Sequence, residues 1–367
     1  MSKTYIGIDN KAREVRKIYV GINNVARRVK RAYLGINNVA KCIFSNAELY
    51  YYGTASNLSV AKDNFAATTV GNYALFGGGY GINGSQCATV DTYNSSLTKG
   101  VATDLSVGRH YLAATTVGNY ALFGGGYGGG DYSSSVDTYN SSLTKGVATD
   151  LSEARDGLLA TTIGNYALFA GGFPNFATVD TYNSSLTKGV ATNLSVGRAY
   201  LGTTSVGNYA LFGGGYNYNN TNYYATVDTY NSSLTKGIAT DLSVGRTYLG
   251  TTSVGNYALF GGGYTGSADC TTVDTYNSSL TKGVATDLSV IKNGLAATTI
   301  GNFALFAGGG NATVDTYDSS LTKGTVSNLS ESKAWLAATS IGNYALFGGG
   351  HNTTNGVRYD TVDVYAI

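Results

Sequence analysis

Two short strings of residues recur seven times along this chain, and this repetition constrains its fold more than any other feature. The first string, GNYALFGGG with small changes, recurs at intervals of 41 to 48 residues and begins at Gly71, Gly118, Gly164, Gly207, Gly255, Gly301 and Gly342. The second string, VDTYN or a close variant, begins at Val90, Val136, Val179, Val227, Val273, Val314 and Val362. Such a period is typical of propeller blades, in which each repeat forms one small antiparallel sheet. We therefore expect an all-β, seven-bladed β-propeller.

Each repeat is expected to supply four strands. In the second repeat, Leu112–Val117 precedes Gly118-Asn119, a pair that favours a tight turn with positive φ. Tyr120–Phe123, Val136–Tyr139 and Gly146–Leu151 provide the other three strands. The Ala and Thr residues of the first strand suit an innermost position, where neighbouring blades crowd around the axis. The Leu and Phe of the second strand are large enough to fill the wedge between blades.

A third string predicts how the ring closes. NSSLTKG, or DSSLTKG, occurs only six times, from Asn94 to Gly324, and the last repeat stops at Ile367 without one. The tail of the segment Leu49–Val60, just before the first repeat, aligns with the tail of Lys99–Val107. We therefore expect an N-terminal strand to complete the last blade, because closure pairs backbone groups that an open edge would leave unpaired.

The order of features in each repeat resembles a known family. A hydrophobic strand that ends in a glycine pair is followed by a V-x-x-Y strand and then by a basic residue before the next inner strand. This order is similar to that of kelch repeats, and the resemblance covers residues 47–367. The tryptophan usual in the outer strand of kelch repeats is absent, since the single Trp335 lies elsewhere. The resemblance implies a kelch-like propeller domain over 47–367.

Residues 1–46 form a separate, basic, β-rich arm. They carry ten Lys and Arg against Asp9 and Glu14, and the pattern Tyr-x-Gly-Ile recurs every 14 residues from Tyr5. Hairpin-type turns are expected at Asp9-Asn10, Asn23-Asn24 and Asn37-Asn38. A four-strand meander and an intertwined oligomeric stalk both fit this pattern. So short a segment buries little surface by itself, and we expect contact with a partner to stabilise it.

The arm also resembles the short repeats of structural proteins, of the tail or virion-attachment kind, from phages and prophages of Gram-positive bacteria. The string that carries this resemblance is YVGINNVARRVK. It implies that the arm docks to other virion or tail proteins, and we expect Arg27, Arg28, Lys30 and Arg31 to make that contact. A basic strand face is more often a protein-docking surface than a nucleic-acid site, so nucleic acid is not expected as a partner.

Comparison of the seven repeats distinguishes the two faces of the expected disc. The turn between strands one and two is Gly-Asn in every copy, whereas the loop between strands two and three (the 2–3 loop) differs in every copy. The connection from strand four to the next blade (the 4–1 connection) varies as well. Free drift of exposed loops would affect both faces equally. The variable face is rich in Tyr, Asn, Ser and Gly, a composition typical of binding surfaces, and we favour binding over drift.

Aromatic side chains of the variable face are the candidate ligand-binding residues. Tyr111, Tyr200, Tyr248 and Trp335 occupy the same place in four repeats, around the expected channel mouth, where they are suited to stacking on sugar rings. The full set of candidates is Tyr80, Tyr111, Tyr127, Tyr132, Tyr200, Tyr216, Tyr218, Tyr248, Tyr264 and Trp335.

A basic residue stands nine positions before each Gly-Asn turn. These residues are Lys62, Arg109, Arg155, Arg198, Arg246, Lys292 and Lys333. Two interpretations are open. Each residue pairs with an Asp of the VDTY strand or caps carbonyl groups between blades, or the seven form an anion-attracting funnel for phosphate- or carboxylate-bearing glycans.

The sequence offers little support for catalysis. Its two histidines, His110 and His351, belong to repeats that are not neighbours, and no His/Cys/Asp cluster has metal-ligand spacing. Carboxylates such as Asp131, Asp156 and Asp269 would form a glycosidase pair only if the fold brought them together. We expect no enzymatic activity, no cofactor, no metal and no membrane segment, since no apolar run of about 18 residues occurs.

These observations lead to one functional expectation with two alternatives. The protein is expected to belong to a phage or phage-like particle, which assembles in the host cytoplasm and acts outside the cell, and to bind a host-surface glycan or protein through its variable face. It is alternatively a capsid or tail decoration protein with no receptor, or an intracellular kelch adaptor. Because the arm repeats also fit an intertwined stalk, a homo-oligomer is a further alternative.

Overall fold

A computed structural model describes residues 48–367 and, before them, only the backbone of six short strands in the arm. These strands form three separate antiparallel pairs: β1 (Tyr5–Ile8) with β2 (Lys11–Glu14), β3 (Ile18–Ile22) with β4 (Val25–Val29), and β5 (Arg31–Ile36) with β6 (Val39–Ser45). The turns predicted at Asp9-Asn10, Asn23-Asn24 and Asn37-Asn38 lie outside the described residues. The choice between a meander and a stalk stays a prediction.

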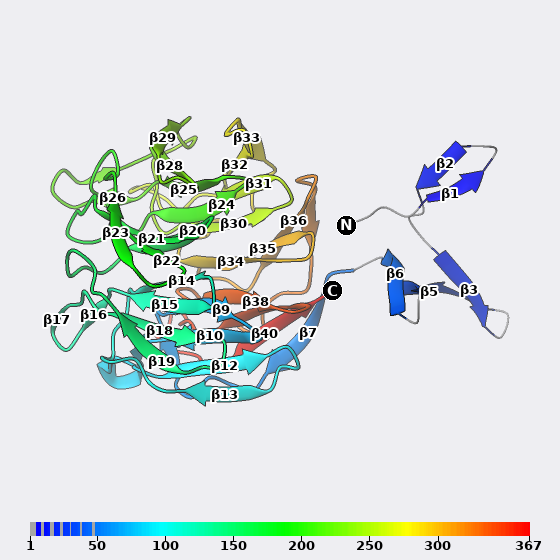
Figure 1. The fold of residues 1–367 in the computed structure, drawn as a ribbon, viewed down its shortest axis with the longest axis horizontal. Helices are drawn as coiled ribbons and strands as arrows, with labels where there is room; N and C mark the ends of the chain where they lie inside the picture. The colour runs from blue at the N-terminus through cyan, green and yellow to red at the C-terminus, as the bar shows by residue number, and fades with distance from the viewer. Residues whose placement is uncertain are drawn as a thin grey trace. The chain divides into compact units, whose positions relative to one another are not determined.

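The larger of two compact units, Tyr50–Ala366, is a seven-bladed β-propeller, as predicted. Seven four-stranded antiparallel sheets surround one axis, and the innermost strand of each contacts those of its two neighbours in a closed ring (Figure 1). Within the described residues the only helical element is the 3₁₀ turn η1 (Ile82–Gly84). None of the described helical residues forms a segment long and apolar enough to cross a bilayer.

The strands are named here by their position in a blade. The innermost strands are β9 (Ala66–Val70), β14 (Ala113–Val117), β20 (Leu159–Ile163), β24 (Gly202–Val206), β30 (Gly250–Val254), β34 (Leu295–Ile300) and β38 (Ala337–Ile341). The second strands are β10 (Tyr73–Gly77), β15 (Tyr120–Gly124), β21 (Tyr166–Ala170), β25 (Tyr209–Gly213), β31 (Tyr257–Gly261), β35 (Phe303–Gly308) and β39 (Tyr344–Gly348). The third strands are β12 (Val90–Asn94), β18 (Val136–Asn140), β22 (Val179–Asn183), β28 (Val227–Asn231), β32 (Val273–Asn277), β36 (Val314–Asp318) and β40 (Val362–Ala366). The outer strands are β13 (Lys99–Ala102), β19 (Lys145–Ala148), β23 (Lys188–Ala191), β29 (Lys236–Ala239), β33 (Lys282–Ala285), β37 (Lys323–Thr325) and β7 (Tyr50–Ala55).

Short strand pairs decorate the 2–3 loops and the 4–1 connections. These are β8 (Lys62–Asp63) with β11 (Tyr80–Gly81), β16 (Tyr127–Gly128) with β17 (Asp131–Tyr132), and β26 (Tyr216–Asn217) with β27 (Asn222–Tyr223). Isolated bridges in other blades, such as Asp156 with Phe173, also tie the start of a 2–3 loop to the preceding 4–1 connection. The variable face is therefore built on hydrogen-bonded loops.

Adjacent side chains of the second strand fill two different interfaces. In β15, Phe123 packs in the cluster between blades 1 and 2, while Leu122 packs in the cluster between blades 2 and 3, and both are fully buried. Successive side chains of a strand point to opposite faces. One apolar pair thus seals both sides of a blade, as the sequence predicts.

A tyrosine in every third strand staples each blade to the one before it. The hydroxyl of Tyr139 donates a hydrogen bond of 2.7 Å to the carbonyl of Thr103, just beyond the end of β13. Tyr182 makes the same contact with Thr149. This contact lies beyond the last residue of β19, Ala148, where the chain leaves the sheet edge. The prediction that this strand continues to Leu151 was therefore wrong at its C-terminal end.

Strand β7 closes the ring, as predicted from the missing seventh string. It pairs antiparallel with β40, with a bulge between Val364 and Tyr365, and lies beside it in Figure 1. The hydroxyl of Tyr51 donates to Oδ1 of Asp363 at 2.9 Å, the aspartate oxygen that a lysine of the outer strand contacts in the other six blades. Oδ1 of Asp363 is therefore also bound by the outer strand of its blade, although the donor is a tyrosine hydroxyl and not a lysine.

Candidate functional site

Seven residues form a continuous ring of hydrogen bonds where the chain enters the inner strands. In every blade this residue has φ between 52° and 61°, and its N–H donates to the carbonyl of its counterpart in the preceding blade at 2.7 to 3.2 Å. We call these residues the collar: Asn64, Tyr111, Gly157, Tyr200, Tyr248, Gly294 and Trp335. The ring closes between Asn64 and Trp335. The collar thus fixes its side chains around the propeller axis.

The collar backbone is costly for most of the residues that form it. Positive φ suits glycine and, to a lesser degree, asparagine, which occupy three of the seven positions. A tyrosine or tryptophan in this conformation costs on the order of 1 kcal/mol. Four large aromatic residues are therefore held where glycine would be less strained. Strain of this kind clusters at functional sites.

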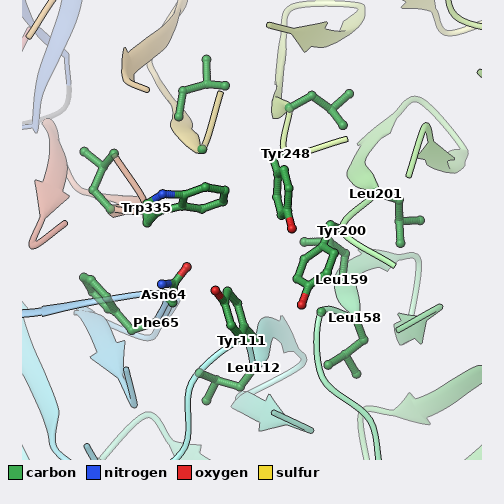
Figure 2. Close-up of a pocket in the computed structure, with 15 residues that line it drawn as sticks. Asn64, Phe65, Tyr111, Leu112, Leu158, Leu159, Tyr200, Leu201, Tyr248 and Trp335 are labelled. Carbon is green, nitrogen blue, oxygen red and sulfur yellow. The ribbon is translucent and has the colours of Figure 1, made fainter. Parts of the chain in front are cut away.

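The collar surrounds a pocket of about 170 Å³ on the propeller axis. Its floor is a second ring of apolar side chains, each one residue after a collar position: Phe65, Leu112, Leu158, Leu201, Leu249, Leu295 and Leu336. In Figure 2 the side chains of Asn64, Tyr111, Tyr248 and Trp335 point toward one another across the pocket. The pocket therefore combines an apolar floor, aromatic walls and a few hydrogen-bonding groups.

The four aromatic rings of the collar contact one another in sequence. The ring centroids of Tyr111 and Tyr200 are 5.6 Å apart, those of Tyr200 and Tyr248 4.8 Å, and those of Tyr248 and Trp335 4.7 Å. Tyr200 also lies over Gly157, where an added Cβ would come within 2.7 Å of the ring, and Trp335 lies over Gly294 in the same way. The two glycines therefore make room for the neighbouring rings.

A second group of rings lies beside the collar, on the 2–3 loops of blades 1 to 5 and, for His110, on the 4–1 connection that enters blade 2. Successive ring centroids in this group are 4.6 to 5.8 Å apart. We call it the aromatic band: Tyr80, His110, Tyr127, Tyr132, Phe173, Tyr218, Tyr216, Tyr223 and Tyr264. The ring of His110 also contacts Tyr111 at 4.8 Å, which connects the band to the collar.

Every aromatic residue predicted from the sequence belongs to the collar or to the band. The prediction omitted His110, Phe173 and Tyr223, which are members of the band. Phe173 opens its 2–3 loop at the position that Tyr127 holds in the previous blade, so comparison of repeats was able to find it. His110 adjoins a predicted residue, but its contacts depend on loops distant in sequence.

The seven basic residues predicted near the channel mouth lie inside the blades. All seven are fully buried, and each pairs with the aspartate of its own third strand at 2.7 to 3.6 Å. The pairs are Lys62 with Asp91, Arg109 with Asp137, Arg155 with Asp180, Arg198 with Asp228, Arg246 with Asp274, Lys292 with Asp315, and Lys333 with Asp363. The sequence left open whether these residues pair with aspartates or form an anion-attracting funnel. In the structure all seven pair with aspartates and do not line a funnel.

The electrostatics of these pairs explain why the side chains point inward. Burial alone would raise the pKa of Asp137, but a hydrogen bond from Ser106 and the charge of Arg109 outweigh it and hold that pKa below its usual value. Arg109 also donates to the carbonyl of Phe123 at 3.1 Å. A buried charge needs such partners to offset its desolvation. Each basic residue therefore serves the blade rather than the channel.

One buried carboxyl on the variable face has no such partner. Asp156 is 7% exposed and directly precedes Gly157 of the collar, and its Oδ1 has no hydrogen-bond partner. Burial raises its pKa to about 6. The charge of Asp156 contributes to raising the pKa of Tyr111 and of Tyr200, after the larger effect of burial. Through its bridge to Phe173 and its neighbour Gly157, Asp156 adjoins both the aromatic band and the collar.

The predicted particle-docking side chains, Arg27, Arg28, Lys30 and Arg31, lie outside the described residues. Within residues 48–367, no three His, Cys, Asp or Glu side chains gather closely enough to hold a metal ion. Comparison of the chain with models of known protein families finds no match, and comparison with curated protein sequences finds no relative. Fold and site together define a seven-bladed β-propeller with an aromatic axial pocket.

Proposed function

We propose that this protein is a host-binding component of a phage or phage-like particle, and that its collar pocket binds a glycan of the host cell surface. The observation that carries the proposal is the collar itself. Four aromatic residues hold a strained backbone conformation around one pocket, at positions where the same chain elsewhere uses glycine. A residue retained against its backbone preference points to a role for its side chain.

The composition of the pocket suits a sugar ring. Aromatic faces stack against the C–H faces of a sugar, and tyrosine hydroxyls and the Asn64 amide offer hydrogen bonds to its hydroxyl groups. A cavity of about 150 Å³ is large enough to hold one benzene molecule. The collar pocket, at about 170 Å³, has room for one six-membered ring. The buried basic residues give no support to acidic substituents on that sugar.

The particle setting rests on the arm. Its 14-residue repeats resemble those of phage and prophage structural proteins, and the blades resemble kelch repeats. In this proposal Arg27, Arg28, Lys30 and Arg31 attach the protein to the particle, while the propeller presents the collar to the host. A decoration protein without a receptor is the competing function, and the binding experiment below separates the two.

The test removes the rings while keeping the backbone. Tyr200→Gly with Tyr248→Gly uses the residue that already holds the collar conformation at Gly157 and Gly294. Binding is measured to purified cell walls and wall polysaccharides of Gram-positive bacteria. Loss of one aromatic anchor typically costs about 2 kcal/mol, so we expect affinity to fall at least about 30-fold.

Ser142→Ala is the matched control on the opposite face of the disc. Ser142 is exposed, and the contact it makes in the turn comes from its backbone N–H, which the substitution keeps. Its binding should equal that of the parent protein. Equal binding by the glycine double variant, or no binding of wall glycans by the parent protein, would contradict the proposal and favour decoration.

A further inference from the structure

Asp156 differs from every other buried aspartate of the propeller. Nine aspartates are buried among the described residues. Eight of them have a basic side chain within 4.0 Å: the seven of the third strands, and Asp63. Within residues 48–367, Asp156 has no such partner, and its Oδ1 accepts no hydrogen bond.

Asp63 provides a direct comparison, because it occupies the same repeat position as Asp156. Oδ2 of Asp63 lies 2.7 Å from Nδ1 of His351 and 3.0 Å from Nε of Arg358, and its Oδ1 accepts a bond from Asn64. Among the described residues, the fold thus supplies the guanidinium of Arg358 to a carboxyl at this position in blade 1 but no basic side chain in blade 3. Removing a carboxylate from water without a counter-charge is costly, so a carboxyl retained here is suited to an external cation.

The residue that carries the unpaired carboxyl adjoins both groups of aromatic rings. Asp156 forms a β-bridge with Phe173 of the aromatic band and directly precedes Gly157, over which the ring of Tyr200 lies. Burial raises the pKa of the Tyr111, Tyr132, Tyr200 and Tyr218 hydroxyls, and the charge of Asp156 contributes in the same direction. The next residue, Gly157, lines the collar pocket. The faces of aromatic rings attract cations, most strongly where water is excluded. The carboxylate and the ring faces therefore both attract a positively charged ligand that lies over blade 3.

We propose that Asp156 and its neighbouring tyrosines form a subsite for an ammonium group, so that the glycan bound in the collar pocket carries a positively charged amine. This inference rests on the proposed glycan-binding function. The anion-attracting funnel considered from the sequence would have bound a ligand of the opposite charge. The seven basic residues are buried in ion pairs. Within residues 48–367, Asp156 is therefore the buried carboxyl beside the collar that lacks a basic partner.

The test changes the ligand and the carboxyl separately. Wall glycans that bind the parent protein are treated with acetic anhydride, which converts free amines to uncharged amides. Affinity for the parent protein is expected to fall at least tenfold on acetylation. Asp156→Asn should bind treated and untreated glycans alike, at the level of the parent protein with treated glycans. Asp131→Asn, which removes an exposed carboxylate of the same face, should behave as the parent protein does.

A competition arm distinguishes the source of the ammonium group. Choline chloride, whose quaternary amine cannot be acetylated, is added to the complex of the parent protein with untreated glycan. Displacement by choline, with acetylation ineffective, supports the subsite and assigns a quaternary ammonium substituent. Acetylation and choline both without effect would overturn the inference, as would an Asp156→Asn variant that keeps the preference for untreated glycan. Neither result contradicts glycan binding by the collar, which the tyrosine-to-glycine variants test.

Discussion

Tyr111, Tyr200, Tyr248 and Trp335 hold a backbone conformation that their neighbours Gly157 and Gly294 adopt without strain. The collar hydrogen bonds impose this conformation on all seven positions, whatever the side chain. Glycine, asparagine and aromatic residues alike therefore complete the ring, although Gly157 and Gly294 lie too close to the neighbouring rings of Tyr200 and Trp335 to accept a Cβ. At the level of single residues, the propeller separates a fixed backbone frame from a variable set of side chains around the pocket.

Asp156 gives a pH-dependent prediction at the same scale. Its pKa is about 6 in the folded protein against an ordinary value of 3.8, which amounts to a destabilisation of about 3 kcal/mol once the carboxyl is ionised. A raised carboxyl pKa weakens the folded state as pH rises from about 4 to above 6, and has no effect where both states are protonated. Asp156→Asn should therefore melt with the parent protein near pH 3.5 and at a higher temperature near pH 7.5.

Thermal melting of both proteins across this pH range is the measurement. Asp131→Asn is the control, since Asp131 is exposed and its melting difference from the parent protein should stay small at all pH values. A melting difference for Asp156→Asn that is the same at pH 3.5 and pH 7.5 would show that the carboxyl is not held at a cost. If Asp156→Asn raises the melting temperature and loses the preference for amine-bearing glycan, the carboxyl trades stability for binding, as functional residues often do.

Strand β7 joins the two ends of the propeller at the level of single elements. It pairs with β40, and the residues after it hold blade 1: Ser59 donates through its N–H and its hydroxyl to Asp91, and the carbonyl of Ser56 accepts from Tyr93. The same segment therefore completes the last blade and staples the first. Ring closure in this propeller depends on contacts between residues about 300 apart in sequence.

Deleting residues 47–60 should open the ring. Blade 7 would lose its outer strand, and blade 1 would lose its staple to Ser56 and its contacts from Ser59. An exposed strand edge also promotes association. We expect aggregation or a large fall in melting temperature, measured by scanning calorimetry and light scattering. Deletion of residues 1–44, which keeps the closing strand, is the control and should melt as the parent protein does. Equal melting of both deletions would refute closure by β7.

Local patterns predicted much of the whole molecule. The repeats gave the number of blades, the missing seventh string gave the closing strand, and the contrast between loops gave the face with the aromatic pocket. These features follow from strand periodicity and from turn residues such as Gly118. The docking role of the arm stays a prediction, because the side chains of residues 1–46 lie outside the described residues. The particle setting also stays a prediction, because it rests on a sequence resemblance.

The details of the site escaped sequence analysis for physical reasons. The collar conformation arises from hydrogen bonds between blades, and no shared local preference of Asn64, Tyr111 and Gly157 foretells it. The direction of the basic residues was open, since the same spacing suits a channel and a buried pair. The isolation of Asp156 depends on which side chains do not reach it, and only the assembled ring shows this.

The single tryptophan of the chain allows the most direct test of the collar as a binding site. Trp335 lines the pocket, so any ligand that enters it changes the surroundings of the indole. Titration of the protein with wall glycan should change its tryptophan fluorescence saturably, with the same dissociation constant as calorimetry gives, and Tyr200→Gly with Tyr248→Gly should abolish that change. A glycan that binds by calorimetry and leaves the Trp335 emission unchanged would contradict the collar pocket as the site.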